Sequence, residues 1–405
     1  MAPSCAPRLV QAFGLFLLLA CAARAKDVLV LLGDQKMERS HANFLADLRD
    51  AGLQLDVKSF TDSQLRLQSW GTWLYDGVLV LAGKTGKVGG ALDAAYLVDF
   101  VDSGRGLFIA TDQHAPDALR EVAAELGSDL LDSDAQLTDH ISHAPDLGAT
   151  APLCPPPTLA PVAGGGDAPI LYRGGAMTLS PDATLTTPVL LPAPTATAGS
   201  LLGPQLVLAT ALQTRANARA VIAASTDLFS DAFFAAAAGN RAFAAAAALW
   251  AFGERGALRL SNFRHARAGA AAPPPHNTYT VNDTVHVSLD LHENGPRGWE
   301  AHVTDALQLE YTMLDPHVRQ TMRHEGGGRY ALTVRTPDVY GVFKWVVDYK
   351  APGYSGVAVS EVAPLRPLRH DEYPRFIVQA YPYYVALLSV SVAFLALVTV
   401  VMYHE

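Results

Sequence analysis

The chain has 405 residues, of which 50% are hydrophobic and 17% are charged, and its formal net charge at pH 7 is −9. This weakly acidic balance argues against a nucleic-acid-binding protein, so we expect no nucleic acid among its partners. A chain of this length should form two or three domains.

Residues 1–25 have the three parts of a secretory signal peptide. Arg8 lies near the start, an apolar run extends from Leu9 to Ala20, and Ala23-Arg24-Ala25 forms an exit of small residues. We expect the mature chain to begin at Lys26. The alternative is a buried N-terminal helix.

Cysteine usage limits how the fold is stabilised. Cys5 and Cys21 fall within the signal peptide, which leaves Cys154 alone. A single cysteine forms no intrachain disulfide, even in the oxidising compartment that a signal peptide implies. The fold must therefore depend on its hydrophobic cores.

From Val28 to about Gly127, short apolar runs alternate with segments of helical spacing, which predicts a parallel sheet covered by helices. Strand-like runs return after residue 204, so we expect one α/β domain over residues 26–260. The predicted strands are Val28–Leu32, Leu53–Ser59, Val78–Leu81, Leu107–Ala110, Leu206–Leu212 and Ala220–Ala224. Helical spacing is found at Phe44–Leu48 and at Leu92–Phe100, and an alanine-rich helix should end near Phe252. The middle region, 144–204, is dense in proline and glycine, which predicts loops or short edge strands.

The period of the pattern changes after Pro273-Pro274-Pro275. Apolar residues then alternate with polar ones, with turn residues between the runs. The runs include Val285–Leu291, Leu307–Tyr311, Tyr330–Val334 and Val342–Tyr349. This pattern predicts an all-β sandwich of immunoglobulin-like size over residues 270–365. The cysteine pair of antibody domains is absent, so only the architecture is predicted.

Residues 383–403 (YYVALLSVSVAFLALVTVVMY) contain no charged side chain, and at about 1.5 Å per residue they would span roughly 30 Å of hydrocarbon. They predict one transmembrane helix in contact with membrane lipid. With the signal peptide, it predicts a single-pass type I protein whose bulk is lumenal or extracellular and whose cytosolic tail is residues 404–405. The positive-inside rule opposes this orientation, because it would place Arg366, Arg369 and Arg375 on the cytosolic side. Long domains, however, translocate largely regardless of charge.

Two segments carry side chains that could do chemistry. Asp139-His140-Ile141-Ser142-His143, with Asp146 nearby, could ligate zinc, although the spacing matches no closed ligand set. The alternative is a solvated loop.

Ser225 and Asp227 follow a predicted strand, as a hydrolase nucleophile would, but the G-x-S-x-G elbow is absent. The alternative is that Ser225, Thr226 or Asp227 caps the following helix. The turn at Gly33-Asp34-Gln35-Lys36 lacks the G-x-G-x-x-G pattern, and Gly83-Lys84-Thr85-Gly86-Lys87 lacks the spacing of a phosphate-binding loop. We therefore predict no catalytic residue, no cofactor and no metal site.

Two other features are candidate sites of modification or assembly. Asn282-Asp283-Thr284 is an N-glycosylation sequon near the start of the predicted sandwich. Ala386, Ser389, Ala393 and Ala396 align on one face of the predicted membrane helix, where small side chains let a partner helix approach closely. The alternative is that these small residues have no docking role and only reflect the high alanine content of the whole chain.

Several long stretches resemble one protein family. They are LVLLGDQKMERSHANFLADLRDAGLQL (29–55), PILYRGGAM (169–177), NARAVIAASTDLFSDAFF (217–234), PDVYGVFKWVVDY (337–349) and VAPLRPLRHDEYPRFIVQAYPYY (362–384). Together they resemble the forty-eight kilodalton subunit family of dolichyl-diphosphooligosaccharide–protein glycosyltransferase, a non-catalytic part of the oligosaccharyltransferase complex. The resemblance covers essentially the mature chain.

This resemblance implies a role in N-linked glycosylation at the endoplasmic reticulum membrane, supporting the assembly and stability of the complex. It implies as partners a multi-pass catalytic subunit, ribophorin I, ribophorin II and the small defender-against-death subunit. It also implies an N-terminal domain similar to glutamine amidotransferases but without their catalytic cysteine.

Two departures from the family stand out. The family has a lysine-rich cytosolic tail, which is missing after Tyr403-His404-Glu405, and the region after Phe234 is shortened and alanine-rich. Two alternatives remain open from the residues alone. One is a self-standing lumenal hydrolase or amidotransferase-like enzyme, and the other is a cell-surface adhesion receptor.

Overall fold

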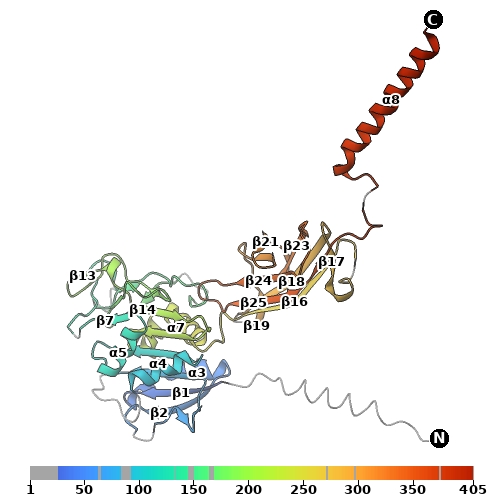
Figure 1. Cartoon of the computed structure of the whole chain (residues 1–405). Coiled ribbons are helices and arrows are strands. Elements are labelled where there is room, and N and C mark those ends of the chain that lie inside the picture. Colours follow the sequence, from blue (N-terminus) through green and yellow to red (C-terminus); the bar gives the residue numbers. More distant parts are fainter. Residues whose placement is uncertain are drawn as a thin grey trace, which may run out of the picture. The chain divides into compact units, whose positions relative to one another are not determined.

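The computed structural model of the chain describes residues 26–62, 65–83, 93–132, 134–144, 150–163, 168–270, 272–295, 298–373 and 375–404. The predicted signal peptide therefore lies outside the described residues. The chain divides into two compact units (Figure 1). The α/β unit comprises the chain up to Arg259 with His292–Glu300 and Lys350–Gly356, and the β unit comprises Leu260–Leu291, Ala301–Tyr349 and Val357–Glu405.

The α/β unit is built on a seven-stranded sheet with the strand order β11-β14-β15-β6-β5-β1-β2. Its parallel strands are β1 (Asp27–Leu32), β2 (Gln54–Ser59), β5 (Gly77–Ala82), β6 (Gly106–Thr111) and β15 (Arg219–Ala223). Two further strands form antiparallel pairs at one edge: β14 (Ala209–Gln213) pairs with β15, and β11 (Thr186–Leu190) pairs with β14. The parallel sheet predicted for the first part of the chain is present, but the sheet as a whole is mixed. Only residues 214–218 join β14 to β15, and so short a link can connect antiparallel strands only.

Helices cover both faces of this sheet, because alternate residues of each buried strand point to opposite sides. Val28 and Val30 of β1 belong to the same core as Phe44 of α3 (Ala42–Asp50) and Phe243 of α7 (Ala238–Ala251). The intervening Leu29 and Leu31 pack in a second core with residues of α4 (Ala94–Asp102) and α5 (Asp117–Glu125). Both predicted early helices are present, although Leu92 lies outside the described residues.

The carboxyl end of α7 lies so close to the sheet that two strands begin with glycine. A Cβ on Gly77 would stand 2.5 Å from the Phe252 ring, and one on Gly106 would stand 2.5 Å from the Ala251 carbonyl oxygen.

Short elements complete the unit. They are α2 (Lys36–Ser40), α6 (Asp231–Ala236), β3 (Gln68–Ser69), β4 (Thr72–Trp73), β7 (Ser128–Leu130), β8 (Leu153–Cys154), β9 (Ile170–Leu171), β10 (Met177–Leu179), β12 (Thr197–Ala198) and β13 (Leu201–Leu202). Those from β8 to β13 lie in the proline- and glycine-rich region, as predicted.

The β unit contains two antiparallel sheets. One has the order β16-β18-β23-β22, with β19 beside β18, and the other has the order β21-β20-β24-β25. The strands are β16 (Leu258–Arg267), β18 (Thr284–Gly295), β19 (Gly298–Ala301), β20 (Gln308–Thr312), β21 (Pro316–Thr321), β22 (Arg323–Gly326), β23 (Arg329–Arg335), β24 (Lys344–Tyr349) and β25 (Val357–Val362). A short parallel pair joins β17 (Tyr279–Thr280) to β26 (Leu365–Arg366). Strand β16 precedes the predicted boundary at residue 270, because it pairs with β18 across the proline run.

Side chains from the two sheets meet in an aromatic core. Along β24, Trp345, Val347 and Tyr349 are buried and alternate with more exposed residues, as the sequence pattern predicts. The Trp345 ring lies 4.0 Å from that of Tyr311 in β20 and 6.3 Å from that of His265 in β16 of the other sheet. The coarse prediction of a β-rich second domain is therefore confirmed.

The chain ends in a single long helix, α8 (Tyr381–Tyr403), preceded by the short turn η4 (Val378–Ala380). Among the described residues, this is the one helix long and apolar enough to cross a membrane. It begins two residues before the predicted start, because Pro382 is well tolerated in the first turn of a helix. The prediction of one apolar C-terminal helix that fits a membrane span is confirmed.

Candidate functional site

The carboxyl edge of the parallel strands is where open α/β sheets bind ligands and place catalytic groups. Strands β2, β1, β5, β6 and β15 lie side by side in the order second, first, third, fourth and fifth along the chain. The direction of winding therefore changes between β1 and β5. The residues that follow these strands decide whether this edge could react.

Ser225 follows β15 at this edge, but its side chain is fully buried. The hydroxyl donates to the carbonyl of Arg173 and accepts from the amide of Leu228 at 3.2 Å. Asp227 forms an ion pair with Arg173, with 2.6 Å between Oδ2 and Nε. Ser225 therefore satisfies an amide of the following turn, as the capping alternative predicts, while neither Thr226 nor Ser230 caps a helix through its side chain.

His41, which the sequence patterns did not single out, is the imidazole that reaches this turn. Its Nε2 lies 3.1 Å from the Thr226 carbonyl oxygen, and its Nδ1 lies 3.2 Å from the Met37 carbonyl oxygen. The ring bridges α2 and the Ser225 turn and contacts no nucleophile hydroxyl there. Its Nδ1 also lies 2.9 Å from the Oγ of the preceding residue, Ser40, so the serine–histidine contact at this edge joins two neighbouring residues and does not involve Ser225. The ring therefore holds the loops at the carboxyl edge together.

The Asp139 segment is a structural turn. The Asp139 carboxylate accepts hydrogen bonds from the amides of Ile141 (2.8 Å) and Ser142 (2.9 Å) and from the hydroxyl of Thr195 (2.7 Å). Burial alone would raise the pKa of Asp139, but these hydrogen bonds outweigh it and hold the pKa below its usual value. The carboxylate is buried, so the alternative of a solvated loop is wrong for Asp139.

No group of three His, Cys, Asp or Glu side chains suited to a metal ion occurs within the described ranges. Asp146, the fourth member of the predicted set, lies outside them, as do Lys84, Thr85, Gly86 and Lys87 of the candidate phosphate loop.

Cys154 is buried as a free thiol in β8. Burial raises its pKa far above that of an exposed thiol, and the Asp139 carboxylate adds to the shift. A thiol held in this neutral form cannot act as a nucleophile at physiological pH.

An open cavity of about 560 Å³ lies beside the carboxyl ends of β1 and β2. Its lining includes Lys36, Arg39 and Lys58, together with Glu38. Lys58 is also paired with Asp56 at 3.1 Å. The lining therefore places three cations near the Ser59 hydroxyl at this edge of the sheet.

The sequon residue Asn282 is exposed in the turn between β17 and β18. It adopts a left-handed backbone conformation, with φ of 62°, which asparagine tolerates better than most residues. Its side-chain amide donates to the Asp338 carboxylate at 3.0 Å. Asn282 is therefore a surface residue whose side-chain amide is bonded to Asp338.

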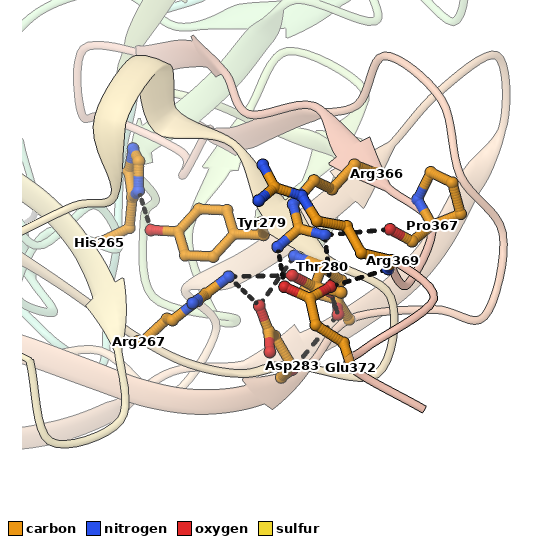
Figure 2. Close-up of polar contacts among 10 residues, drawn as sticks. His265, Arg267, Tyr279, Thr280, Asp283, Arg366, Pro367, Arg369 and Glu372 are labelled. Atoms are coloured by element: carbon orange, nitrogen blue, oxygen red, sulfur yellow. Dashed lines mark hydrogen bonds and ion pairs between the residues drawn. The ribbon is translucent and has the colours of Figure 1, made fainter. Parts of the chain in front are cut away.

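Figure 2 shows a polar cluster where the chain leaves the last strand of the β unit. Arg267 donates to the Thr280 hydroxyl and pairs with Asp283, each at 2.9 Å. Arg366 donates to both carboxylate oxygens of Glu372 at 2.6 Å. The sequence analysis did not find this pair, because nothing in the spacing of Arg366 and Glu372 predicts that the chain folds back there.

On α8, every described side chain is exposed, including Ala386, Ser389, Ala393 and Ala396. The Ser389 hydroxyl donates to the Ala386 carbonyl at 2.8 Å, so it is satisfied within the helix. At about 100° per residue the four small residues share one face. Ser391 makes the equivalent bond to Leu387 on the opposite face.

Comparison with known proteins gives a consistent result over both units. The profile described as "OST48, N-terminal domain" matches residues 19–254, and the one described as "OST48 middle domain" matches residues 265–405. The chain belongs to the OST48 family. The two matches together cover most of the chain.

Three similar relatives are each named the 48 kDa subunit of dolichyl-diphosphooligosaccharide–protein glycosyltransferase. The protein from Arabidopsis thaliana is 35% identical, with 93% of each chain covered. Those from Drosophila melanogaster and Danio rerio are each 32% identical, covering 90% and 89% of this chain and 88% of their own.

Two solved structures align weakly. Agd3, a carbohydrate deacetylase, aligns with a TM-score of 0.31 and 12% identity, over 49% of this chain and 29% of Agd3. A ThuA-like protein from Parabacteroides merdae aligns with a TM-score of 0.33 and 14% identity, over 56% of this chain and 90% of that protein. Scores this low carry no argument about fold or activity.

Proposed function

We propose that the chain is a non-catalytic scaffold subunit of the oligosaccharyltransferase complex. In this role it supports the assembly and stability of the complex during N-linked glycosylation, when a glycan passes as a block from dolichyl diphosphate to asparagine. The observation that carries the proposal is the family match across both units. The engagement of Ser225 and Cys154 in the protein interior supports a non-catalytic role.

The proposed location is the endoplasmic reticulum membrane, with α8 as a single type I anchor and both units in the lumen. The proposed partners are the multi-pass catalytic subunit, ribophorin I, ribophorin II and the defender-against-death subunit. The small face of α8, formed by Ala386, Ser389, Ala393 and Ala396, would pack against a membrane helix of one of them.

Finer assignments of the two folds are part of the same proposal. The strand order of the parallel strands supports an amidotransferase-like α/β domain, since it follows the doubly-wound order of flavodoxin-like sheets. The two antiparallel sheets around one core support an immunoglobulin-like sandwich.

Neither alternative function gains support. A lumenal hydrolase would need an accessible Ser225, whose hydroxyl is buried and bonded. An adhesion receptor would reside at the plasma membrane, whereas the relatives are named as subunits of a glycosyltransferase.

Depletion and rescue test the scaffold role. Cells depleted of the chain should show lower sequon occupancy and less co-purification among the other subunits, and the Ser225→Ala variant should restore both. Normal glycosylation and an intact complex after depletion would reject the proposal. So would glycan transfer to an acceptor peptide by the purified chain alone.

We also propose that Asn282 is itself glycosylated. The Asn282→Gln variant should lose a shift in mobility that endoglycosidase removes from the parent chain. Asn262 is the matched control: it is exposed, has φ of 51° and donates to Asp290, but it is not in a sequon. An unchanged mobility of the Asn282→Gln variant would reject this part.

A further inference from the structure

An apolar surface, here named the tip patch, is exposed at one end of the β unit. It consists of Leu314, which follows β20, and of Val339, Tyr340 and Val342, which lie between β23 and β24. The exposed fractions are 93% for Leu314, 67% for Tyr340 and 68% for Val342. Single exposed apolar residues are common, but four large ones on two adjoining loops mark a contact surface.

The two loops are packed together on the core. A Cβ on Gly341 would lie 2.7 Å from the sulfur of Met313, the residue before Leu314. Phe343, directly after the patch, is buried, and its ring stacks on that of Tyr311 at 4.8 Å. The tip patch is therefore one surface attached to the aromatic core of the unit.

The chain leaves for the membrane helix from this same end. Gly341, within the patch loop, exchanges main-chain hydrogen bonds of 3.0 and 2.8 Å with Leu365, the first residue of β26. The next residue, Arg366, forms the two-pronged pair with Glu372 that Figure 2 shows. The amide of Arg369 also donates to Glu372, at 2.9 Å. These contacts, hereafter the clip, fold residues 366–372 back on themselves.

The clip shortens the link between the tip patch and the bilayer. Only residues 373–380 remain between Glu372 and the start of α8 at Tyr381. Eight residues extend at most about 28 Å, at roughly 3.5 Å each. The patch is thus confined to the neighbourhood of the bilayer that anchors α8.

We propose that the tip patch rests on the membrane in which α8 is anchored, with Tyr340 among the headgroups and Leu314 and Val342 directed toward the acyl chains. Tyrosine prefers this interface because its ring is apolar and its hydroxyl is polar, and aliphatic side chains add binding energy there. The occupant is lipid because the tether keeps lipid within reach. This goes beyond the scaffold role, since it fixes the height of the β unit above the membrane.

Fluorescence quenching tests the proposal on the full-length chain in nanodiscs. An environment-sensitive label is attached through Leu314→Cys or, as the control, through Val303→Cys. Val303 is also exposed, at 65%, but it follows His302, whose amide donates to Leu291 in β18. The patch loop instead follows Arg335, which pairs with Thr284 at the other end of β18. Cys154 is buried and stays unlabelled.

Brominated phosphatidylcholine should quench the label at position 314 at least about twofold more than the label at position 303. Equal quenching at the two positions overturns the proposal. So does a label at position 314 that escapes the lipid quencher in the assembled complex, because a partner subunit then covers the patch.

The clip supplies a second measurement that does not disturb the patch. Glu372→Gln removes the carboxylate that holds Arg366, lengthens the tether and should lower quenching at position 314. Glu325→Gln is the matched control, because Glu325 is exposed and its pair with Arg329 is long, at 3.9 Å. Equal quenching in the two variants would overturn the role of the clip.

Discussion

The two units differ in which groups their buried polar side chains hold and in where neighbouring apolar side chains are exposed. In the α/β unit, the buried Arg219 and Ser225 are bonded to main-chain groups, so the polar chemistry of this unit holds loops and helices in place. In the β unit, some buried polar contacts join side chains, such as His265 to Tyr279, and others reach the main chain, such as Tyr311 to Ala363, while Leu314 extends into solvent. Buried polar side chains therefore fix loops and helices in the α/β unit, and the β unit carries the tip patch.

The largest expected effect on this difference between the units comes from Arg219→Met in the α/β unit. The guanidinium donates to the carbonyls of Trp250, Arg255 and Gly256 at 3.2, 2.6 and 2.9 Å, and burial lowers its pKa to about 10. The substitution removes three hydrogen bonds from a charged donor. It leaves the Arg255 carbonyl without a donor among the described residues, while Trp250 and Gly256 keep main-chain donors, so the free energy of unfolding should fall by about 3 kcal/mol or more.

Denaturant unfolding of the full-length chain in detergent measures the effect of Arg219→Met. Arg241→Met is the control, because it removes an exposed pair with Asp47 and should change stability little. Equal stability of the two variants would show that the buried arginine is not a main support of the α/β unit.

A matched pair of tryptophans sharpens the contrast between the units. Trp250 and Trp345 are both fully buried, but the Trp250 indole donates to the Gly353 carbonyl at 2.6 Å, whereas the Trp345 indole has no hydrogen-bond partner among the described residues. Trp250→Phe should therefore lower the free energy of unfolding by about 1–3 kcal/mol more than Trp345→Phe. The same unfolding assay compares them, and a larger loss for Trp345→Phe would contradict the contrast.

The sequence predicts elements better than it predicts contacts. Apolar runs at Val28–Leu32 and Leu107–Ala110 mark strands because buried parallel strands require continuous apolar residues. The strand at β14 was predicted, but its antiparallel direction was not, because that direction follows from the short loop 214–218 that joins it to β15. Nothing in the spacing of Ser225 and Arg173 indicated their hydrogen bond, because the residues come together only after the sheet has formed. The tip patch was missed for the same reason: Val342 looked like the first residue of an alternating strand, and its exposure depends on tertiary packing.

The membrane helix provides a third, smaller effect. Ser389→Leu with Ala393→Leu should reduce co-purification of partner subunits severalfold, because large side chains prevent close approach of a second helix. Ser391→Leu is the control on the opposite face, with the same bond to the preceding turn. If both variants recover partners as well as the parent chain does, the small face has no docking role, and the contact surface of the β unit is confined to its folded part.

The smallest expected effect is the pH dependence of stability that a buried and an exposed carboxylate contribute. Asp139 in the α/β unit and Glu372 in the β unit both have lowered pKa values, that of Glu372 about 2 because of the hydrogen bond from Arg366. A lowered pKa stabilises the folded state above the unfolded-state value and loses that contribution as the pH falls through the folded-state value. The stability difference between the parent chain and Asp139→Asn should be about 1–2 kcal/mol at pH 6 and should shrink below about pH 4.

Salt distinguishes the two carboxylates further. The contribution of Glu372 is exposed and should disappear in about 1 M salt, where charges are screened within roughly 3 Å, while that of Asp139 should persist because its partners are buried amides and a hydroxyl. Unfolding of Asp139→Asn and Glu372→Gln at low and high salt measures both. A salt-sensitive Asp139 would mean that its turn is solvated, and it would remove one of the features that set the α/β unit apart.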